Sequence, residues 1–486
     1  MNPPSTSPAP CSSCCPSTFF YGWIVVLAAG LACICSFPGN TFGIAFFIPH
    51  LRHELHLSHV EIALVWGAGV FIVALLLPFV GKIVDWQGPW RVLAATTLPL
   101  ALATLTMSWV QTWWQLLLLI AVMRMFGVGL IYVAAVRATN HWFKVKRGRV
   151  SVLLIICFYA TMALPSIVSW LIAEYGWRAT YRIVAVAMTV GMGGVLSLIR
   201  DSPLMYGLLV DGASVQSHSS RSGCSVEAND TTTTVELVEI APPKTVETIE
   251  TIETVEQVGY GMKEATHTLI FWILALNIFV VELYWCACQF NMLLLLGPES
   301  KRAQLLESQV VVVMVVLSVA SGCGSVFAGW AIEKLQLRRA QHGIPHRRGL
   351  MVLVSMQMVL TMASAIVVVH IRSMAMAVVW GLLFSFMIGI QDVVMLVAFA
   401  EIFGKEKIGE IMGLVTAVMT LGTVGGPVLG AIVLESGDLE MFFYPMAACA
   451  GALAVGCHFV QDPIPARKVE VLHRSVYHVA VAEICI

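Results

Sequence analysis

The chain has 486 residues, of which 58% are hydrophobic and 12% are charged, and its mean hydropathy is +0.84. Because charged residues make up about a quarter of a typical soluble domain, this composition excludes a soluble protein and predicts an integral membrane protein. A net charge of −1 leaves no basic excess, so no nucleic-acid partner is expected. The thirteen cysteines lie mostly in apolar runs and imply no disulfide framework.

The chain opens with residues 1–19, which we expect to form a cytoplasmic tail. This tail contains CSSCC, Cys11 to Cys15, just before the first apolar run. Cysteines in this position can be palmitoylated, but the segment favours a plain disordered tail. The first apolar run is too long for the core of a cleaved signal, so we expect it to remain in the mature chain.

Twelve apolar stretches follow, each long enough to span a bilayer, which takes about 20 helical residues. They lack the alternating polarity of a membrane β-barrel, so the predicted fold is all-α. The predicted spans are residues 20–49, 59–81, 90–109, 113–139, 148–173, 178–199, 267–297, 307–332, 348–370, 373–403, 408–434 and 440–460.

Lysine and arginine gather in every second connection between these spans. Because basic residues concentrate in short cytoplasmic loops, the pattern places both termini in the cytoplasm. The basic residues of these connections are Lys82, Arg91, Lys144, Lys146, Arg147, Arg149, Lys334, Arg338, Arg339, Arg347, Arg348, Lys405 and Lys407.

A long polar segment separates the sixth span from the seventh. Residues 201–265 are rich in Ser, Thr and Glu, and they repeat a Thr-Val/Ile-Glu unit. Such a segment buries too little apolar surface to offset its ordering entropy, so we expect a disordered cytoplasmic linker. It divides the chain into two six-helix halves, residues 20–200 and 266–461, and a cytoplasmic tail follows at 462–486.

A charged, glycine-punctuated motif follows the second span of each half. In GKIVDWQGPWR these are Gly81, Asp85, Gly88 and Arg91. The later stretch GWAIEKLQLRR keeps the first glycine, the acidic residue and the arginine as Gly329, Glu333 and Arg339. Two six-helix halves with related turns are typical of a transporter built of internal repeats.

The first motif resembles the signature G-x-x-x-D-x-x-G-x-x-[RK] of the Major Facilitator Superfamily. MRMFGVGL, with Arg124, Gly127 and Gly129, resembles a second signature of that family in the fourth helix. The resemblance implies two halves that rock about a midplane site. It also implies that the turn with Asp85 and Arg91 acts as a cytoplasmic latch, although a plain topological turn is the alternative.

Within the superfamily, the chain is most similar to the monocarboxylate-transporter-like and oxalate/formate branch. The segments that carry this similarity are YGWIVV, NTFGIAFF, EYGWRATY and FGKEKIGEIMGLV. It implies a carrier in the plasma membrane. The expected partners are a small-molecule solute, protons and the lipid bilayer, and the chain is expected to act as a monomer without a cofactor.

Ionisable residues within the spans mark candidate sites, because each is costly in hydrocarbon unless it faces a cavity or a partner. Arg124 suits either a structural role or a proton or anion site. Glu282 and Asp392 suit either proton carriage or a buried ion pair. The polar residues grouped with Glu282 as candidates are Tyr284, Gln289 and Asn291.

The first span contains Asn40 and Thr41 directly after Pro38 and Gly39. A proline-glycine break frees backbone carbonyls and lets polar side chains line a cavity. A kink that only shapes packing is the alternative, and the sequence leaves both open.

The chain departs from the monocarboxylate branch in one respect. Members of that branch carry a cation near the midplane in the first, eighth or eleventh helix, whereas these three spans contain neither lysine nor arginine at the corresponding depth. Either Arg124 binds an anionic substrate, or the substrate is neutral or zwitterionic, or a cationic substrate pairs with Glu282 and Asp392.

Other chemistry is not indicated. No phosphate-binding G-x-x-x-x-G-K-[ST] stretch or nucleophile-base pair is present, so neither nucleotide-driven transport nor an enzyme is predicted. Four histidines at every third position from His50 to His59 favour a wet loop over a metal site. The prediction is a secondary transporter of a small organic solute, first a proton-coupled monocarboxylate carrier, with a drug or metabolite antiporter and a non-transporting receptor as alternatives.

Overall fold

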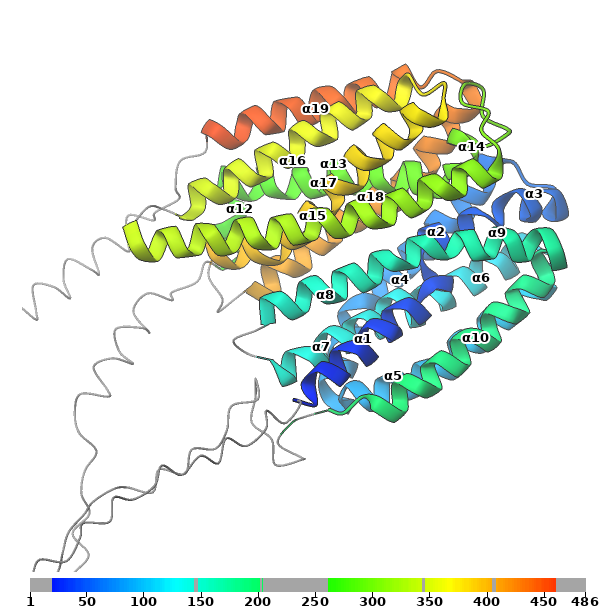
Figure 1. The fold of residues 1–486 in the computed structure, drawn as a ribbon, viewed down its shortest axis with the longest axis horizontal. Coiled ribbons are helices and arrows are strands. Elements are labelled where there is room, and N and C mark those ends of the chain that lie inside the picture. The colour runs from blue at the N-terminus through cyan, green and yellow to red at the C-terminus, as the bar shows by residue number, and fades with distance from the viewer. Residues whose placement is uncertain are drawn as a thin grey trace, which may run out of the picture.

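In the computed structural model, the chain forms a bundle of long helices that run side by side (Figure 1). The structure describes residues 20–143, 147–201, 203, 261–342, 346–403 and 408–459, and every regular element within these ranges is helical. The helices form two groups, one from each half of the sequence, coloured blue to green and green to red in Figure 1. The prediction of an all-α membrane fold with two halves is confirmed.

The N-terminal half consists of the elements before the linker. Helices satisfy their own backbone hydrogen bonds, which makes them the stable form for apolar segments in lipid. The elements are α1 (Gly22–Cys35), η1 (Phe37–Gly39), α2 (Thr41–Ala45), α3 (Ile48–Leu55), α4 (His59–Gln87), α5 (Pro89–Thr106), η2 (Met107–Trp109), α6 (Trp113–Arg124), η3 (Met125–Ile131), α7 (Tyr132–Trp142), α8 (Arg147–Ala160), η4 (Thr161–Ala163), α9 (Leu164–Tyr175) and α10 (Trp177–Leu198).

The C-terminal half begins with a short helix that lies within the range predicted as linker. Residues 204–260 of that range, like the predicted tails 1–19 and 462–486, lie outside the described residues. The elements of this half are α12 (Met262–Thr266), α13 (Leu269–Phe290), α14 (Met292–Leu296), α15 (Glu307–His342), α16 (His346–Val369), α17 (Met374–Phe403), α18 (Ile408–Ser436) and α19 (Glu440–Phe459).

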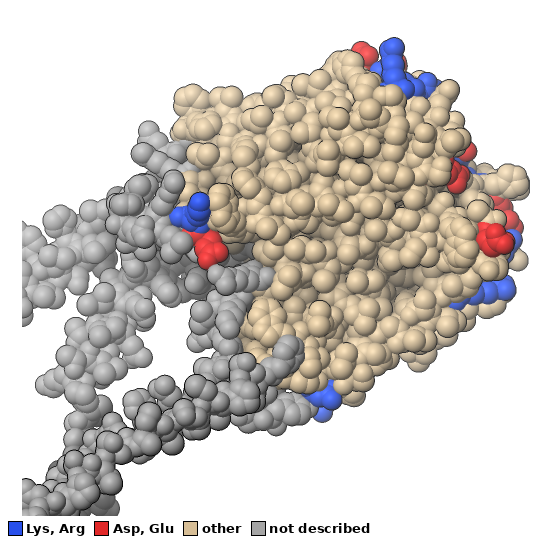
Figure 2. All heavy atoms as spheres, viewed as in Figure 1, with Lys and Arg blue, Asp and Glu red and all other residues tan. Residues whose placement is uncertain are grey.

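Within the described part of the chain, eleven helical stretches are long and apolar enough to cross a membrane. The remaining predicted crossing, residues 20–49, is made of the shorter pieces α1, η1 and α2 because the helix is interrupted. On the face in Figure 2, acidic and basic side chains gather at the two ends of the bundle, with a broad uncharged belt between them. This distribution suits a multi-pass membrane protein.

The two halves meet along two long seams and one shorter contact. Helix α4 packs against α18, α8 packs against α15, and α2 of the broken crossing packs against α13. At the first seam, a Cβ atom built on Gly67 would lie 3.2 Å from the carbonyl oxygen of Val424, so the two backbones approach closely. These seams place the inner faces of both halves around one central region.

The helices that carry the two glycine-punctuated motifs are longer than predicted. Helix α4 continues to Gln87 and α15 to His342, so Asp85 and Glu333 are helical, like Gly81 and Gly329 within the predicted spans, rather than in turns. The predicted spans ended too early, at residues 81 and 332. They were drawn from apolar runs, and such runs do not include the charged helical turns that extend beyond the hydrocarbon. At the first motif, the chain reverses between α4 and α5 at Gly88, whose φ of 84° suits glycine, before Pro89 starts α5.

Candidate functional site

The centre of the bundle contains two helix interruptions that fit together. Pro38 and Gly39 break the first crossing in η1, and the fourth crossing becomes π-helical in η3, directly after Arg124. A Cβ atom built on Gly127 of η3 would lie 3.3 Å from the Cα of Gly39, so glycine permits this contact. The contact brings Arg124 beside the broken helix.

Arg124 uses a backbone carbonyl that the break sets free. Its Nη1 donates a hydrogen bond to the carbonyl oxygen of Gly39 at 3.2 Å. The guanidinium carbon lies 5.8 Å from the ring centroid of Trp66 on α4, a cation–π arrangement. Arg124 also interacts electrostatically with Glu282 of the other half. Arg124 is thus bonded within its own half and lies within electrostatic range of a carboxylate of the other half.

Glu282 lies on α13 and is only partly buried. Its Oε1 accepts a hydrogen bond from the hydroxyl of Thr423 at 2.9 Å and one from the thiol of Cys286 at 3.3 Å. Thr423 can reach it because α18 packs closely here: a Cβ atom built on Gly422 would lie 3.2 Å from the Cβ of Glu282. The carboxylate therefore has two neutral hydrogen-bond donors and one cation, Arg124, nearby.

Asp392 on α17 joins the two halves. Its Oδ2 accepts a hydrogen bond of 2.5 Å from the hydroxyl of Tyr159 on α8. The backbone carbonyl of Tyr159 in turn accepts a bond of 2.9 Å from the hydroxyl of Ser318 on α15. Asp392 and Glu282 are close enough to interact electrostatically. The two carboxylates that the sequence singles out thus belong to one electrostatic system.

Aromatic side chains surround this system. The ring of Trp285 on α13 stacks on Phe384 at 4.8 Å and meets Tyr159 edge-on at 6.1 Å. Trp66 lies 5.6 Å from the ring of Phe290. A central region with few charges and many rings suits an organic solute with an apolar body.

The other predicted site residues have mixed surroundings. Asn40 and Thr41 are buried at the helix break, where the Asn40 amide donates to Ser36 at 3.4 Å. Tyr284 lies inside the C-terminal half, and its hydroxyl accepts a bond of 3.0 Å from Trp380. Asn291 and Gln289 are both buried near the C-terminal end of α13.

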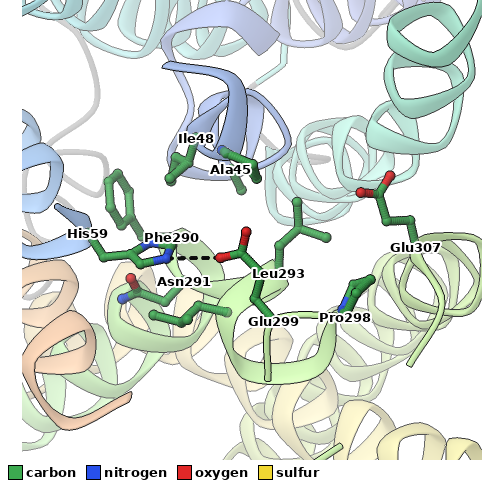
Figure 3. Close-up of a pocket in the computed structure, with 11 residues that line it drawn as sticks. Ala45, Ile48, His59, Phe290, Asn291, Leu293, Pro298, Glu299 and Glu307 are labelled. Carbon is green, nitrogen blue, oxygen red and sulfur yellow. Dashed lines mark hydrogen bonds and ion pairs between the residues drawn. The ribbon is translucent and has the colours of Figure 1, made fainter. Parts of the chain in front are cut away.

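A cavity of about 110 Å³ lies between the halves where α3, α4, α14 and α15 meet (Figure 3). Ala45, Ile48 and His59 line it from the N-terminal half, and Phe290, Asn291 and Leu293 line it from the C-terminal half. Figure 3 shows His59 and Glu299 pointing toward one another across this cavity. The predicted topology makes this end of the bundle extracellular.

Polar contacts close this end. Arg52 Nη1 donates to Glu299 Oε2 at 3.1 Å, and His59 Nε2 lies 3.3 Å from the same oxygen. The backbone N–H of His59 donates to Glu435 Oε1 at 3.1 Å. Two residues of the N-terminal half thereby contact two carboxylates of the C-terminal half. His59 of the histidine cluster, for which the sequence favours a wet loop, makes two of these three contacts.

At the opposite end, an acidic residue occupies the start of α5, directly after the reversal at Gly88. It is Asp201, whose Oδ1 accepts a bond of 2.7 Å from the backbone N–H of Trp90. A carboxylate at a helix N-terminus is favoured by the helix dipole. Arg91 is exposed beside it, and the side chain of Asp85 lies outside the described ones. The latch role of the predicted motif therefore stays a prediction.

Sequence reasoning missed the partners of the charged residues. Tyr159, Thr423 and Trp66 sit in apolar helices, and each meets its partner through packing between distant spans. Asp201 could have been noticed from the sequence, since it is an acidic residue that lies shortly after the sixth span and two residues before a proline.

Comparison with known proteins fits this architecture. A profile of the Major Facilitator Superfamily matches residues 29–370 and 307–480. The fold is similar to the crystal structure of a bacterial homologue of the human lysosomal transporter Spinster, solved inward-facing and unoccupied. That likeness has a TM-score of 0.56 at 13% identity and covers 91% of this chain and 95% of that one.

One curated relative is similar over part of its length. Over 128 residues the chain is 30% identical to the fujikurins efflux protein of Gibberella fujikuroi, a stretch that spans 26% of this chain and only 27% of the relative. The monocarboxylate-transporter-like branch stays a prediction. The profile match covers both halves of the bundle. The chain therefore belongs to the Major Facilitator Superfamily and is a multi-pass membrane transporter.

Proposed function

We propose that this transporter is a proton-coupled antiporter that expels a small organic solute by alternating access. In this scheme the solute binds between the two halves near Arg124, and Glu282 and Asp392 carry the protons. Sequence alone ranks monocarboxylate symport first and antiport second. The surroundings of Arg124 favour antiport.

The observation that carries the proposal is that Arg124 already has partners. Its guanidinium donates to the carbonyl of Gly39 and interacts with the charge of Glu282. A substrate carboxylate would have to compete with Glu282 for this arginine. The first, eighth and eleventh spans offer no lysine or arginine at that depth to replace it. An uncharged or cationic solute meets no such obstacle.

The hydrogen-bond partners of the two carboxylates suit proton carriage. Glu282 is bonded by the hydroxyl of Thr423, and Asp392 by the hydroxyl of Tyr159. A hydroxyl donates to an ionised carboxylate and can rotate to accept from a protonated one, so either state keeps a partner. Carboxylates inside membrane spans commonly form proton relays.

The proposed direction of transport, export, follows from the partial relative and from the two acidic groups. The partial relative is named an efflux protein. Export driven by protons that enter the cell is a simple use of the two acidic groups, Glu282 and Asp392. Uptake of a monocarboxylate with a proton is the competing function, supported by the sequence segments of that branch.

Vesicles loaded with a pH-sensitive dye separate the two functions. Purified protein is placed in liposomes with an acidic lumen, and 2-quinolone, tetraphenylphosphonium or lactate is added outside. Antiport predicts that the lumen becomes more alkaline with the first or second compound, and that Glu282→Gln abolishes this change. With acid outside instead, lactate-dependent acidification of the lumen would establish symport and refute the proposal, as would no proton movement under any condition.

A further inference from the structure

Gln289 on α13 has two buried side-chain polar atoms that could each form hydrogen bonds. It is fully buried, and neither Oε1 nor Nε2 has a hydrogen-bond partner among the residues that the structure describes. Asn291, two residues later, is also buried, but its amide donates to the carbonyls of Ala287 at 2.9 Å and Pro427 at 3.1 Å. Burying an amide without partners costs free energy, so its presence here calls for an explanation.

The packing of α13 indicates on which side of the helix Gln289 lies. Leu283 and Ala287 face α18, where Gly426 approaches both of them. Tyr284 packs inside the C-terminal half, whereas Trp285 lies between the halves: it stacks on Phe384 of its own half and also reaches Tyr159 of the other half. Since residues four apart lie on the same face of a helix, Gln289 lies one turn beyond Trp285 on the side that faces the N-terminal half. There, α2 packs against α13.

Gln289 lies next to the cavity between the two halves. It immediately precedes Phe290 and Asn291, which line the extracellular cavity in Figure 3. Phe290 in turn contacts Trp66, whose indole Nε1 is buried and also lacks a partner in the described part of the chain. Unpaired neutral groups thus lie just inside the closed extracellular end, while Arg124 has both a hydrogen bond and a charge partner.

We propose that Gln289 is a solute-binding residue that selects uncharged solutes carrying a hydrogen-bond donor and an acceptor side by side, as in a lactam or an amide. A carboxamide has one acceptor and two donors, so it can form two bonds at once with such a group. The rings of Trp66, Trp285 and Phe290 supply apolar faces for a planar solute body. This inference rests on the proposed antiport of an organic solute and names its class.

Access to Gln289 follows from alternating access. In this structure the extracellular contacts of Arg52 and His59 with Glu299 hold the halves together above it. When those contacts separate, the side of α13 that faces the N-terminal half opens to the outside. Gln289 then meets a solute that is binding or leaving on that side.

The test is equilibrium binding to the purified full-length transporter without any gradient. The probes are 2-quinolone, a planar lactam with adjacent N–H and C=O groups, and its N-methyl derivative, which lacks the donor. We expect the native protein to bind 2-quinolone about tenfold or more tightly than the N-methyl compound, and Gln289→Met to bind both equally. No binding of either compound, or a preference that persists in Gln289→Met, would overturn the inference.

Thermal unfolding provides a second readout that separates a ligand from a structural residue. Replacing Gln289 by methionine breaks no hydrogen bond, because its amide has no partner in the described residues. Gln289→Met should therefore keep or raise the Tm of the solute-free protein. Asn291→Leu is the matched control, and its Tm should fall because two bonds are lost. A fall in Gln289→Met as large as in the control would show a structural amide and overturn the inference. Because no gradient is used, failure of proton coupling leaves these results interpretable.

Discussion

The hydroxyl of Tyr159 on α8 donates a hydrogen bond to Oδ2 of Asp392 on α17, and this bond links the two halves of the transporter next to the seam between α8 and α15. A carrier that works by rocking its halves has to break such a bond in each cycle. A carboxylate at this position also changes its bonding when it takes up a proton. The pair therefore connects protonation with movement of the halves.

The first prediction concerns the strength of this link. Tyr159→Phe removes the donor and leaves a carboxylate without its hydroxyl partner, which costs about 1–3 kcal/mol. Asp392→Asn alters the same bond, so the double variant should lose less stability than the two single variants together. Thermal unfolding of all four proteins measures this coupling. Strictly additive losses would show that the bond contributes nothing to stability.

The second prediction concerns the contacts that close the extracellular end. Ala45 lines the cavity there and is 1% exposed, so Ala45→Cys should react slowly with a membrane-impermeant maleimide. Glu299→Gln removes the carboxylate shared by Arg52 and His59. Since exposed ion pairs contribute about 0–1 kcal/mol, labelling should become up to roughly fivefold faster. Because the chain has other free cysteines, the labelling rate of the same protein without Ala45→Cys is subtracted in each case.

A charge exchange serves as the control for this gate. Arg52→Glu combined with Glu299→Arg restores an ion pair in reversed orientation, so the labelling rate should return toward that of the native contacts. Either single reversal should label faster than the pair. Equal rates in all these proteins would mean that another contact holds the end closed.

The helix positions could be predicted from sequence because continuous apolar runs of sufficient length have no other stable form in lipid. The ends were less predictable: the charged turns of α4 and α15 extend beyond the apolar run. Arg124, Glu282 and Asp392 stand out on sequence, since an ionisable residue within a span is rare. Their hydroxyl and aromatic partners could not be found in this way, because such residues are common in spans and their pairing depends on how distant helices pack.

The third prediction concerns pH. His50 lies on helix α3, at the end of the bundle predicted to be extracellular, and burial holds its pKa below the ordinary value although Glu307 acts in the opposite direction. The unfolded chain therefore takes up the proton more readily than the folded one, and stability falls as the pH drops below about 6.5. His50→Gln should lose less Tm than the native protein between about pH 7.5 and pH 5.5. Parallel Tm curves for the two proteins would refute this.

The fourth prediction concerns the contact that positions Arg124. A Cβ atom built on Gly127 would lie 3.2 Å from the carbonyl oxygen of Ser36 and 3.3 Å from the Cα of Gly39. Gly127→Ala therefore pushes η3 away from the broken helix, at a cost of about 1–3 kcal/mol, and weakens the bond from Arg124 to the Gly39 carbonyl. Gly194→Ala on α10, where a Cβ atom meets nothing within 4 Å, is the matched control. We expect Gly127→Ala to lower both the Tm and the solute-driven proton flux in vesicles, because it moves the arginine. The control should leave the flux unchanged and should not lower the Tm, since alanine favours a helix over glycine. Unchanged flux in Gly127→Ala would mean that this position of Arg124 is not needed for transport.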